Sequence, residues 1–224
     1  MSENKITTII FDAGGVLFYI NEKRNDIAKR LLKSLGYTTE NIDRAIKEGE
    51  VFDEMYFCKH KWIYSWKEEK EWLQGRYNAI ANSIDASNQC LSDKLFILTM
   101  DTYQYVLYDE TMGILENLKN NFNLGVLSNA LPSLDWAFEY LGIRQYFDNI
   151  IISAYEGVEK PNREIYVTAV DKLGSSYEEC IFIDDKIENV EAAISLGIHA
   201  IHLDREKDTL KVLLELLESE FNVA

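Results

Sequence analysis

In the second half of the chain, short apolar runs alternate with segments whose apolar residues have helical spacing. This alternation constrains the fold more than any other feature. From Glu110 onward, amphipathic segments separate four apolar runs, which are residues 124–127, 150–152, 181–183 and 200–203. Strands that alternate with helices of this length form βαβ units, whose strands lie parallel in one sheet. The pattern therefore predicts an α/β fold in which helices cover both faces of a parallel sheet.

A fifth apolar run, at residues 6–11, is separated from the others by about ninety residues with helical spacing. We expect helices around residues 27–35, 42–46 and 92–106, with Gly36 and Gly49 as helix ends. A βαβ crossover does not need a connection of this length. We therefore predict a core domain formed by residues 1–18 and 107–224, and an inserted all-helical cap domain, residues 19–106, that acts as a lid and specificity element.

Polar residues follow four of the apolar runs or lie in the loop after them. They are Asp12, the pair Ser128 and Asn129, Lys160, and the pair Asp184 and Asp185. The carboxyl ends of parallel strands share one edge of the sheet, which is where ligands bind in open α/β folds. We therefore expect these side chains to converge despite their separation in the sequence.

Three carboxylates at one edge raise one another's pKa unless a cation lies among them. Mg²⁺ is a suitable cation, because it binds oxygen ligands from one or two carboxylates together with substrate phosphate. With Mg²⁺ held by Asp184 or Asp185, Asp12 can act as a nucleophile toward phosphorus and form an aspartyl-phosphate. We predict one magnesium-dependent site, and the sequence leaves open which acid of the pair is the direct ligand.

The remaining residues of this set have functions that suit phosphoryl transfer. Lys160 and Ser128 would contact the phosphoryl oxygens, where negative charge accumulates. Gly14 and Gly15 allow the backbone to approach a phosphate closely. Asn129 is predicted to contact the phosphate as well as to cap the next helix.

The ordered set of motifs resembles the haloacid dehalogenase superfamily over the whole α/β core. The matching segments are Phe-Asp-Ala-Gly-Gly-Val-Leu at 11–17, Leu-Ser-Asn at 127–129, Val-Glu-Lys-Pro at 158–161 and Ile-Asp-Asp at 183–185. The predicted insertion falls where this family carries its helical C1 cap. The resemblance implies a Rossmann-like core, Mg²⁺ dependence and phosphatase activity on a small phosphorylated metabolite such as a sugar phosphate or nucleotide.

The resemblance also assigns functions to single residues and shows one departure. The resemblance implies that Asp12 is the nucleophile and that Ser128 and Lys160 bind the phosphoryl group. It implies that the metal is held by Asp12, the Gly14 carbonyl and the Asp184–Asp185 pair. Most phosphatases of the family carry an aspartate where this chain has Gly14, and that aspartate protonates the leaving oxygen. A general acid of this kind is typically worth ~10²–10⁴-fold in rate. We therefore expect slow turnover that favours good leaving groups.

Two other functions remain open from the sequence. A 2-haloacid dehalogenase would use the same nucleophile on carbon without Mg²⁺, and the acid pair argues against it. A catalytically weak protein that binds phosphate or metal for regulation is supported only by Gly14.

Composition narrows the partners to small molecules. The chain has 224 residues and a formal net charge of −15, which disfavours nucleic acid and anionic membranes as partners. Three widely spaced cysteines, the absence of a signal sequence and the lack of a long apolar span predict a cytoplasmic protein. We expect a monomer or a homodimer.

Overall fold

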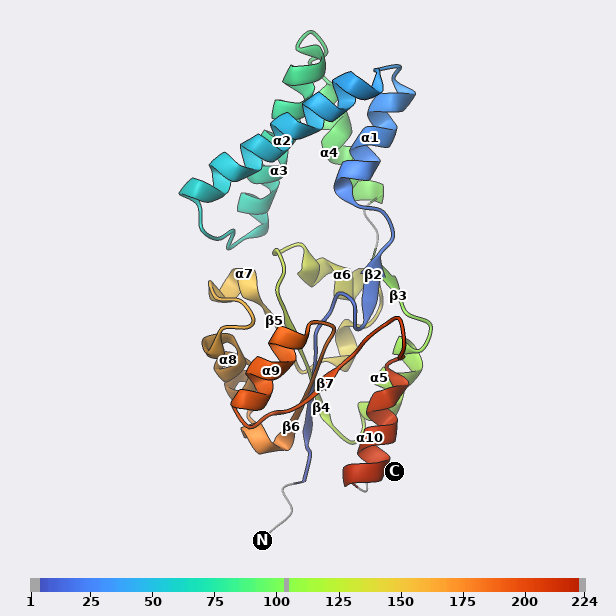
Figure 1. The fold of residues 1–224 in the computed structure, drawn as a ribbon, viewed down its shortest axis with the longest axis vertical. Coiled ribbons are helices and arrows are strands. Elements are labelled where there is room, and N and C mark those ends of the chain that lie inside the picture. The colour runs from blue at the N-terminus through green and yellow to red at the C-terminus, as the bar shows by residue number, and fades with distance from the viewer. Residues whose placement is uncertain (1–4, 103–104, 222–224) are drawn as a thin grey trace. The chain divides into compact units, whose positions relative to one another are not determined.

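The computed structural model describes residues 5–102 and 105–221, and the chain divides into two compact units (Figure 1). The first, which we call the core unit, comprises Met1–Tyr19 and Val106–Ala224. The second, which we call the helical unit, comprises Ile20–Tyr105. The predicted roles of these two parts as a catalytic core and a lid stay predictions.

The core unit is built on a five-stranded sheet with the order β5-β4-β1-β6-β7. Its strands are β1 (Thr8–Phe11), β4 (Asn123–Ser128), β5 (Asn149–Ile152), β6 (Cys180–Asp184) and β7 (His199–His202). All four pairings between neighbouring strands are parallel. The predicted α/β fold class is confirmed, and the first strand of the chain lies in the middle of the sheet.

Helices connect these strands and cover the sheet. They are α5 (Thr111–Leu118), α6 (Leu134–Tyr140), α7 (Ser153–Glu156), α8 (Arg163–Leu173), α9 (Ile187–Ser195) and α10 (Lys211–Phe221), with short 3-10 turns at Arg144–Tyr146 and Tyr177–Glu179. In Figure 1, α8 and α9 lie on one side of the sheet, while α5 and α10 lie on the other. Burial on both faces explains why the central strands read as continuous apolar runs.

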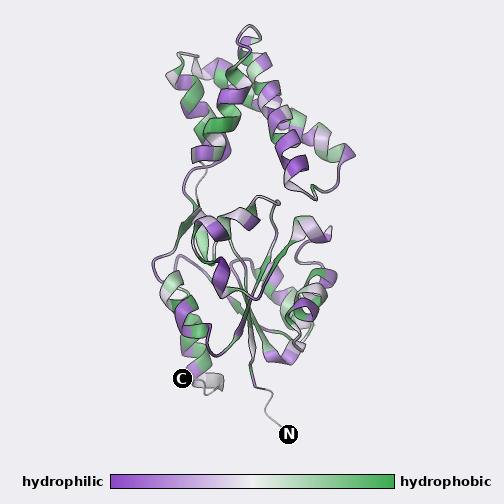
Figure 2. Cartoon of the chain, turned by 180° about the vertical axis from the view of Figure 1, so that it is seen from behind, coloured by the Kyte–Doolittle hydropathy of each residue, from purple (hydrophilic) through white to green (hydrophobic). Residues whose placement is uncertain are grey.

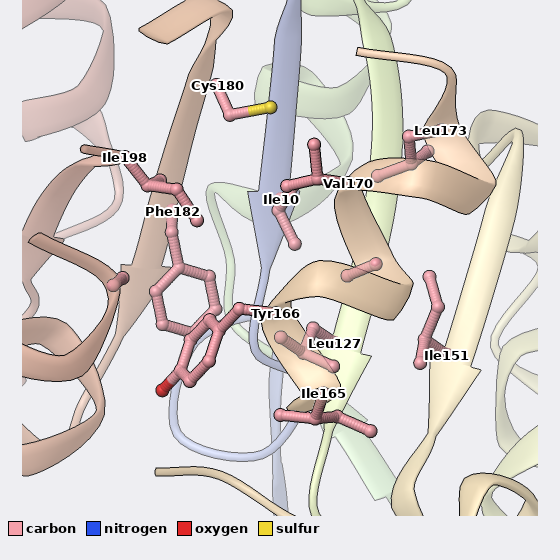
Figure 3. Close-up of a cluster of buried hydrophobic side chains, with 12 residues drawn as sticks. Ile10, Leu127, Ile151, Ile165, Tyr166, Val170, Leu173, Cys180, Phe182 and Ile198 are labelled. Carbon is pink, nitrogen blue, oxygen red and sulfur yellow. The ribbon is translucent and has the colours of Figure 1, made fainter. Parts of the chain in front are cut away.

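The packing of α8 on the sheet forms a buried cluster (Figure 3). Side chains of α8 such as Tyr166 and Val170 point toward Ile10 of β1 and Phe182 of β6. The rings of Tyr166 and Phe182 meet edge to face, with centroids 5.6 Å apart. Neighbouring residues of a strand point to opposite faces of the sheet, so Phe11 points to the face opposite that of Ile10. Its ring packs against Phe147, with ring centroids 6.3 Å apart.

The helical unit consists of α1 (Arg24–Ser34), α2 (Thr39–Lys59), α3 (Trp66–Asp85) and α4 (Leu91–Thr102). Hydrophobic and hydrophilic residues mix along these helices in Figure 2, as expected of helices that bury one face. The unit has its own buried cluster, which includes Leu32, Leu73 and Tyr77. Two independent clusters are consistent with the division into two compact units.

Two predictions about this region are wrong. Gly49 does not end a helix, because α2 continues through it and uses the missing side chain to pack closely on Ile80 of α3. The helical segment predicted to reach residue 106 ends earlier, and Tyr105–Leu107 forms strand β3, which pairs with β2 (Phe18–Ile20). Both are strands of only three residues, too short to show an alternating pattern. Residues 103 and 104, which the same prediction included, lie outside the described residues.

Within the described part of the chain, no helix combines the length and apolar character that a bilayer crossing requires.

Candidate active site

Three neighbouring strands of the core unit end side by side, and each carries a polar side chain at that point. Asp12 follows β1, while Ser128 and Asp184 are the last residues of β4 and β6. The Asp12 N–H donates to the Ile183 carbonyl of β6 at 2.8 Å, which extends the sheet pairing by one residue. The exposed fractions of Asp12, Ser128 and Asp184 are only 8%, 4% and 0%. The tertiary structure therefore brings together three of the residues that the sequence singled out.

Lys160 joins two of these acids from the loop between α7 and α8. Its ammonium group donates to Asp12 Oδ1 at 2.7 Å, to Asp184 Oδ2 at 2.6 Å and to the Leu127 carbonyl at 2.7 Å. The side chain is 1% exposed, so its charge is stabilised by these three acceptors rather than by water. Three acceptors saturate the three N–H groups of a lysine.

Asn129 holds the lysine loop from the adjacent strand end. Its side-chain amide donates to the Lys160 carbonyl and accepts from the Lys160 N–H, both at 2.8 Å. This reciprocal pair fixes the backbone from which the ammonium group projects. The structure thus gives Asn129 a positioning contact that the sequence did not indicate. The prediction that it caps the next helix is wrong, because Ser133 is the N-cap of α6. Its predicted contact with phosphate stays a prediction.

The acid pair divides into a buried and a more accessible carboxylate. Asp184 accepts from the Lys186 N–H at 2.8 Å, and the Asn189 amide donates to both of its oxygens at 3.0 Å. Asp185 is not buried, and its carboxylate lies against the backbone of Gly15. Asn189 therefore orients the Asp184 carboxylate.

The two glycines after Asp12 occupy different environments. Gly15 has a φ of +81°, and a Cβ atom there would lie 2.4 Å from Asp185 Oδ2, so only glycine fits without movement. Gly14 has no such constraint, because a Cβ atom built there would meet no heavy atom within 4 Å. The position at which most phosphatases of the resembled superfamily carry an aspartate therefore has room for a side chain.

The buried charges act on one another. Burial raises the pKa of Asp12 above its usual value; the Lys160 ammonium opposes this shift, and Asp184 adds to it. Burial, and after it the neighbouring Asp184 charge, raises the pKa of Asp185. Three carboxylates facing one lysine leave an excess of negative charge at this edge, so a further cation would stabilise their ionised forms.

The donor set fits a hard divalent cation. Asp12, Asp184 and Asp185 each offer a carboxylate oxygen, and these oxygen atoms lie within 4.8 Å of one another. Mg²⁺ prefers oxygen ligands of this kind and keeps positions for water or phosphate oxygens. The three acids could therefore hold Mg²⁺ together with a substrate phosphate.

Two residues at the same edge were missed by sequence reasoning, and both belong to the fifth strand end. His202 ends β7, and its Nε2 atom lies 3.1 Å from the Asp185 carbonyl oxygen. Arg205 reaches the loop after Asp12 and donates to the Gly15 carbonyl at 3.0 Å. For Arg205 the signal was available, because polar residues follow the apolar run at 200–203 as they follow the other four; His202 lies within that run.

The chain is similar in sequence to known hydrolases and phosphatases. A family model described as haloacid dehalogenase-like hydrolase matches residues 6–197. Among curated relatives, the chain is 43% identical over 70 residues to a sesquiterpene phosphatase of Aspergillus oryzae, covering 31% of this chain and 34% of the relative. It is 27% identical over 136 residues to a glyceraldehyde 3-phosphate phosphatase of Methanothermobacter thermautotrophicus, covering 58% and 60%. The chain matches less than two thirds of the length of these relatives.

Solved structures share the fold at low sequence identity. A 2-haloacid dehalogenase from Pseudomonas syringae matches with a TM-score of 0.69 and 17% identity, over 95% of this chain and 98% of the other. A family enzyme from Bacteroides thetaiotaomicron, solved in complex with magnesium and inorganic phosphate, matches with a TM-score of 0.63 and 20% identity, over 91% and 96%. At these identities the likeness shows the fold alone.

Proposed function

The chain belongs to the haloacid dehalogenase-like hydrolases, and from that premise we propose that it is a Mg²⁺-dependent phosphatase of small phosphorylated metabolites. One observation carries the proposal: the Lys160 ammonium bridges Asp12 and Asp184 at the shared strand edge. A buried carboxylate next to a fixed cation and an acid pair is an arrangement suited to a nucleophile that attacks phosphorus. The relatives named as phosphatases support the same function, and one structure that shares the fold was solved with magnesium and inorganic phosphate.

The reaction would proceed in two displacements at phosphorus. An Asp12 oxygen attacks the phosphorus atom, the bond to the leaving oxygen breaks, and an aspartyl-phosphate forms. Water then attacks the phosphorus of this intermediate, which releases inorganic phosphate and regenerates the Asp12 carboxylate. Ser128 would bind the phosphoryl oxygens, on which charge builds during both displacements. Lys160 would bind them as well once one of its three N–H groups exchanges its present acceptor for a phosphoryl oxygen.

Asp12, the Gly14 carbonyl and the Asp184–Asp185 pair would hold the metal, with Asp184 already oriented by Asn189. Mg²⁺ held there would supply positive charge next to the nucleophile and the transferring phosphoryl group. Because Gly14 provides no carboxylic acid, the leaving oxygen departs without a proton from that position. Substrates whose leaving group is stable as an anion are therefore favoured, and acyl or aryl phosphates should react faster than alkyl phosphates.

The test is release of inorganic phosphate from a panel of aryl phosphates, sugar phosphates and nucleotides, with Mg²⁺ and with EDTA. Asp12→Asn should lower turnover by more than about 10³-fold, as expected when a nucleophile is removed. Asp148→Asn is the matched control, because Asp148 is a paired carboxylate just before β5, at the opposite edge of the sheet. Full activity of Asp12→Asn, or a wild-type enzyme that releases no phosphate from any substrate, would refute the proposal.

Dehalogenation of a 2-haloacid is the alternative that uses the same nucleophile. A 2-haloacid is itself a carboxylate, and attack on carbon does not call for a divalent cation. The carboxylates of Asp12, Asp184 and Asp185 lie close together, and they would repel such a substrate when no metal is bound. Halide release measured on the same preparations, with EDTA present, distinguishes the two activities.

A further inference from the structure

We propose that Arg205 is a positioning residue that holds the loop carrying Asp12 in its active conformation. We call residues 12–17 the nucleophile loop. Arg205 lies three residues after the end of β7, more than 180 residues away from that loop in the sequence. The inference rests on the proposed function, because it assigns Arg205 a task in the same reaction.

The guanidinium group is engaged on every side. Its Nε atom donates to the Gly15 carbonyl at 3.0 Å, and one terminal nitrogen donates to the Val16 carbonyl. The other terminal nitrogen donates to Glu110 Oε1 at 2.5 Å. The Cζ atom lies 3.6 Å from the centroid of the Tyr108 ring, so the planar group also stacks on an aromatic face. Only arginine combines a planar stacking surface with a fork of donors in these directions.

The nucleophile loop depends on partners distant in the sequence for its carbonyl groups. Arg205 binds the carbonyls of Gly15 and Val16, and the next carbonyl, of Leu17, accepts from the Tyr108 N–H at 3.2 Å and from Thr111 Oγ1 at 2.8 Å. Three consecutive carbonyls are thus satisfied by residues more than ninety positions away. Buried backbone groups without partners are destabilising. Removal of Arg205 would leave the carbonyls of Gly15 and Val16 without this donor, and the loop should then move to find other partners.

Glu110 in turn orients Arg205. Burial acts to raise the pKa of Glu110, but the bond from Arg205 and the Leu210 N–H outweigh it and lower the pKa below its usual value. Glu110 is therefore a charged acceptor that pairs with the guanidinium group at the start of α5. We call the contacts of Arg205 with Gly15, Val16 and Glu110 the clamp. The clamp connects the segment after β7 and the segment before α5 to the nucleophile loop.

The position of the loop matters because Asp12 is its first residue. Among the described residues, Arg205 donates to none of the side chains of Asp12, Lys160, Asp184 or Asp185, so it does not touch the proposed reacting groups. It acts through the backbone, which sets where the Asp12 carboxylate and the Gly14 carbonyl stand. A displacement of about 1 Å at a reacting centre can cost about 10²-fold in rate.

The test compares Arg205→Met and Arg205→Lys with the control Arg144→Met. Arg144 belongs to the same unit and donates to a backbone carbonyl, that of Phe147, at 3.0 Å, in a turn before β5. We expect both Arg205 variants to lose about 10–100-fold in kcat for phosphate release with KM changed less than about threefold, because Arg205 acts on the nucleophile and not on the bound substrate. The control should stay within twofold of the wild type in both constants.

A second measurement, hydrogen exchange, reports on the stability of the nucleophile loop and does not require substrate turnover. The Gly15 N–H donates to the Phe18 carbonyl and the Leu17 N–H to the Ala13 carbonyl, so both amides should be protected from hydrogen exchange. We expect at least tenfold faster exchange at these amides in Arg205→Met, and no change in Arg144→Met. Arg205→Lys, which keeps the charge beside Glu110, is used if Arg205→Met does not fold.

The two measurements separate this inference from the proposed function. Unchanged exchange in a folded Arg205 variant overturns the positioning role, whether or not kcat falls. Accelerated exchange in a protein whose wild type releases no phosphate supports the clamp and refutes the phosphatase. Accelerated exchange with kcat unchanged overturns the link between the loop and the reaction.

Discussion

Position 14 separates this chain from most phosphatases that it resembles. The structure shows that the missing side chain leaves room, because a Cβ atom there would meet nothing within 4 Å and the backbone does not adopt a positive φ. Its neighbour Gly15 differs on both counts. The absence of the acid is therefore a matter of chemistry at this residue and is not imposed by packing.

We predict that Gly14→Asp raises kcat for alkyl phosphates by about tenfold or more, since a general acid is typically worth ~10²–10⁴-fold. The gain should be small for p-nitrophenyl phosphate, whose leaving group needs no proton. Steady-state kinetics on both substrates check this, with Gly14→Asn as a control that has the same shape but cannot donate a carboxyl proton. Equal effects of the two substitutions would show that the acid is not what the site lacks.

Lys160 shows which parts of the site could be predicted from the residues. Its place after a strand and before Pro161 indicated a role at the sheet edge. Its actual acceptors, Asp12, Asp184 and the Leu127 carbonyl, come from three different strand ends. Local sequence cannot specify such contacts, because they depend on the order of strands in the sheet. The catalytic roles of these residues stay predictions.

Among the elements, α2 shows how a packing requirement overrides a local signal. Glycine is common at helix ends, so the sequence predicts that a helix ends at Gly49. In the structure α2 runs on for ten further residues, because Gly49 faces Ile80 of α3, where a Cβ atom would lie 2.8 Å from two side-chain atoms. The glycine allows the two helices to approach closely.

Gly49→Ala should therefore destabilise the protein by about 1–2 kcal/mol, as overpacking costs about 1–3 kcal/mol and the helix propensity of alanine returns part of it. Ile80 is fully buried and cannot turn outward. Gly113→Ala in α5 is the matched control, because its Cβ atom would meet nothing within 4 Å and alanine should stabilise that helix by about 0.5–1 kcal/mol. Urea denaturation followed by circular dichroism measures both, and equal signs for the two variants would contradict the packing argument.

For the whole molecule, charge is the dominant global property. The chain carries 38 acidic and 23 basic side chains, which gives a formal net charge of −15. Several ion pairs lie on the surface, for example Lys47 with Glu50 and Lys67 with Glu71. Exposed pairs of this kind contribute at most about 1 kcal/mol each, so repulsion among the excess acids should outweigh them.

We expect the melting temperature to rise with ionic strength, because salt shortens the Debye length from about 30 Å at 0.01 M to about 10 Å at 0.1 M and screens this repulsion. A gain of about 1 kcal/mol corresponds to a rise of about 2–4 °C for a chain of this size. Thermal melts in NaCl with EDTA present isolate the effect from binding of divalent cations. A melting temperature that falls with salt would mean that attractive pairs dominate.

The sequence by itself determined the kinds of element and their order in the core. Apolar runs and helical repeats indicated the five strands of the main sheet, and the order of motifs at their ends indicated the family; both predictions are confirmed. These features are local, because strand and helix periodicities are properties of a few adjacent residues.

Only the tertiary structure decided which distant groups meet. The pairing of Asn129 with the backbone of Lys160, the clamp of Arg205 on the nucleophile loop and the short strands β2 and β3 all join residues far apart in the chain. The first two contacts arise because the parallel five-stranded sheet places the carboxyl ends of its strands at one edge, where residues from 12 to 205 become neighbours. The periodicity of a single segment does not indicate which of these distant residues will be in contact.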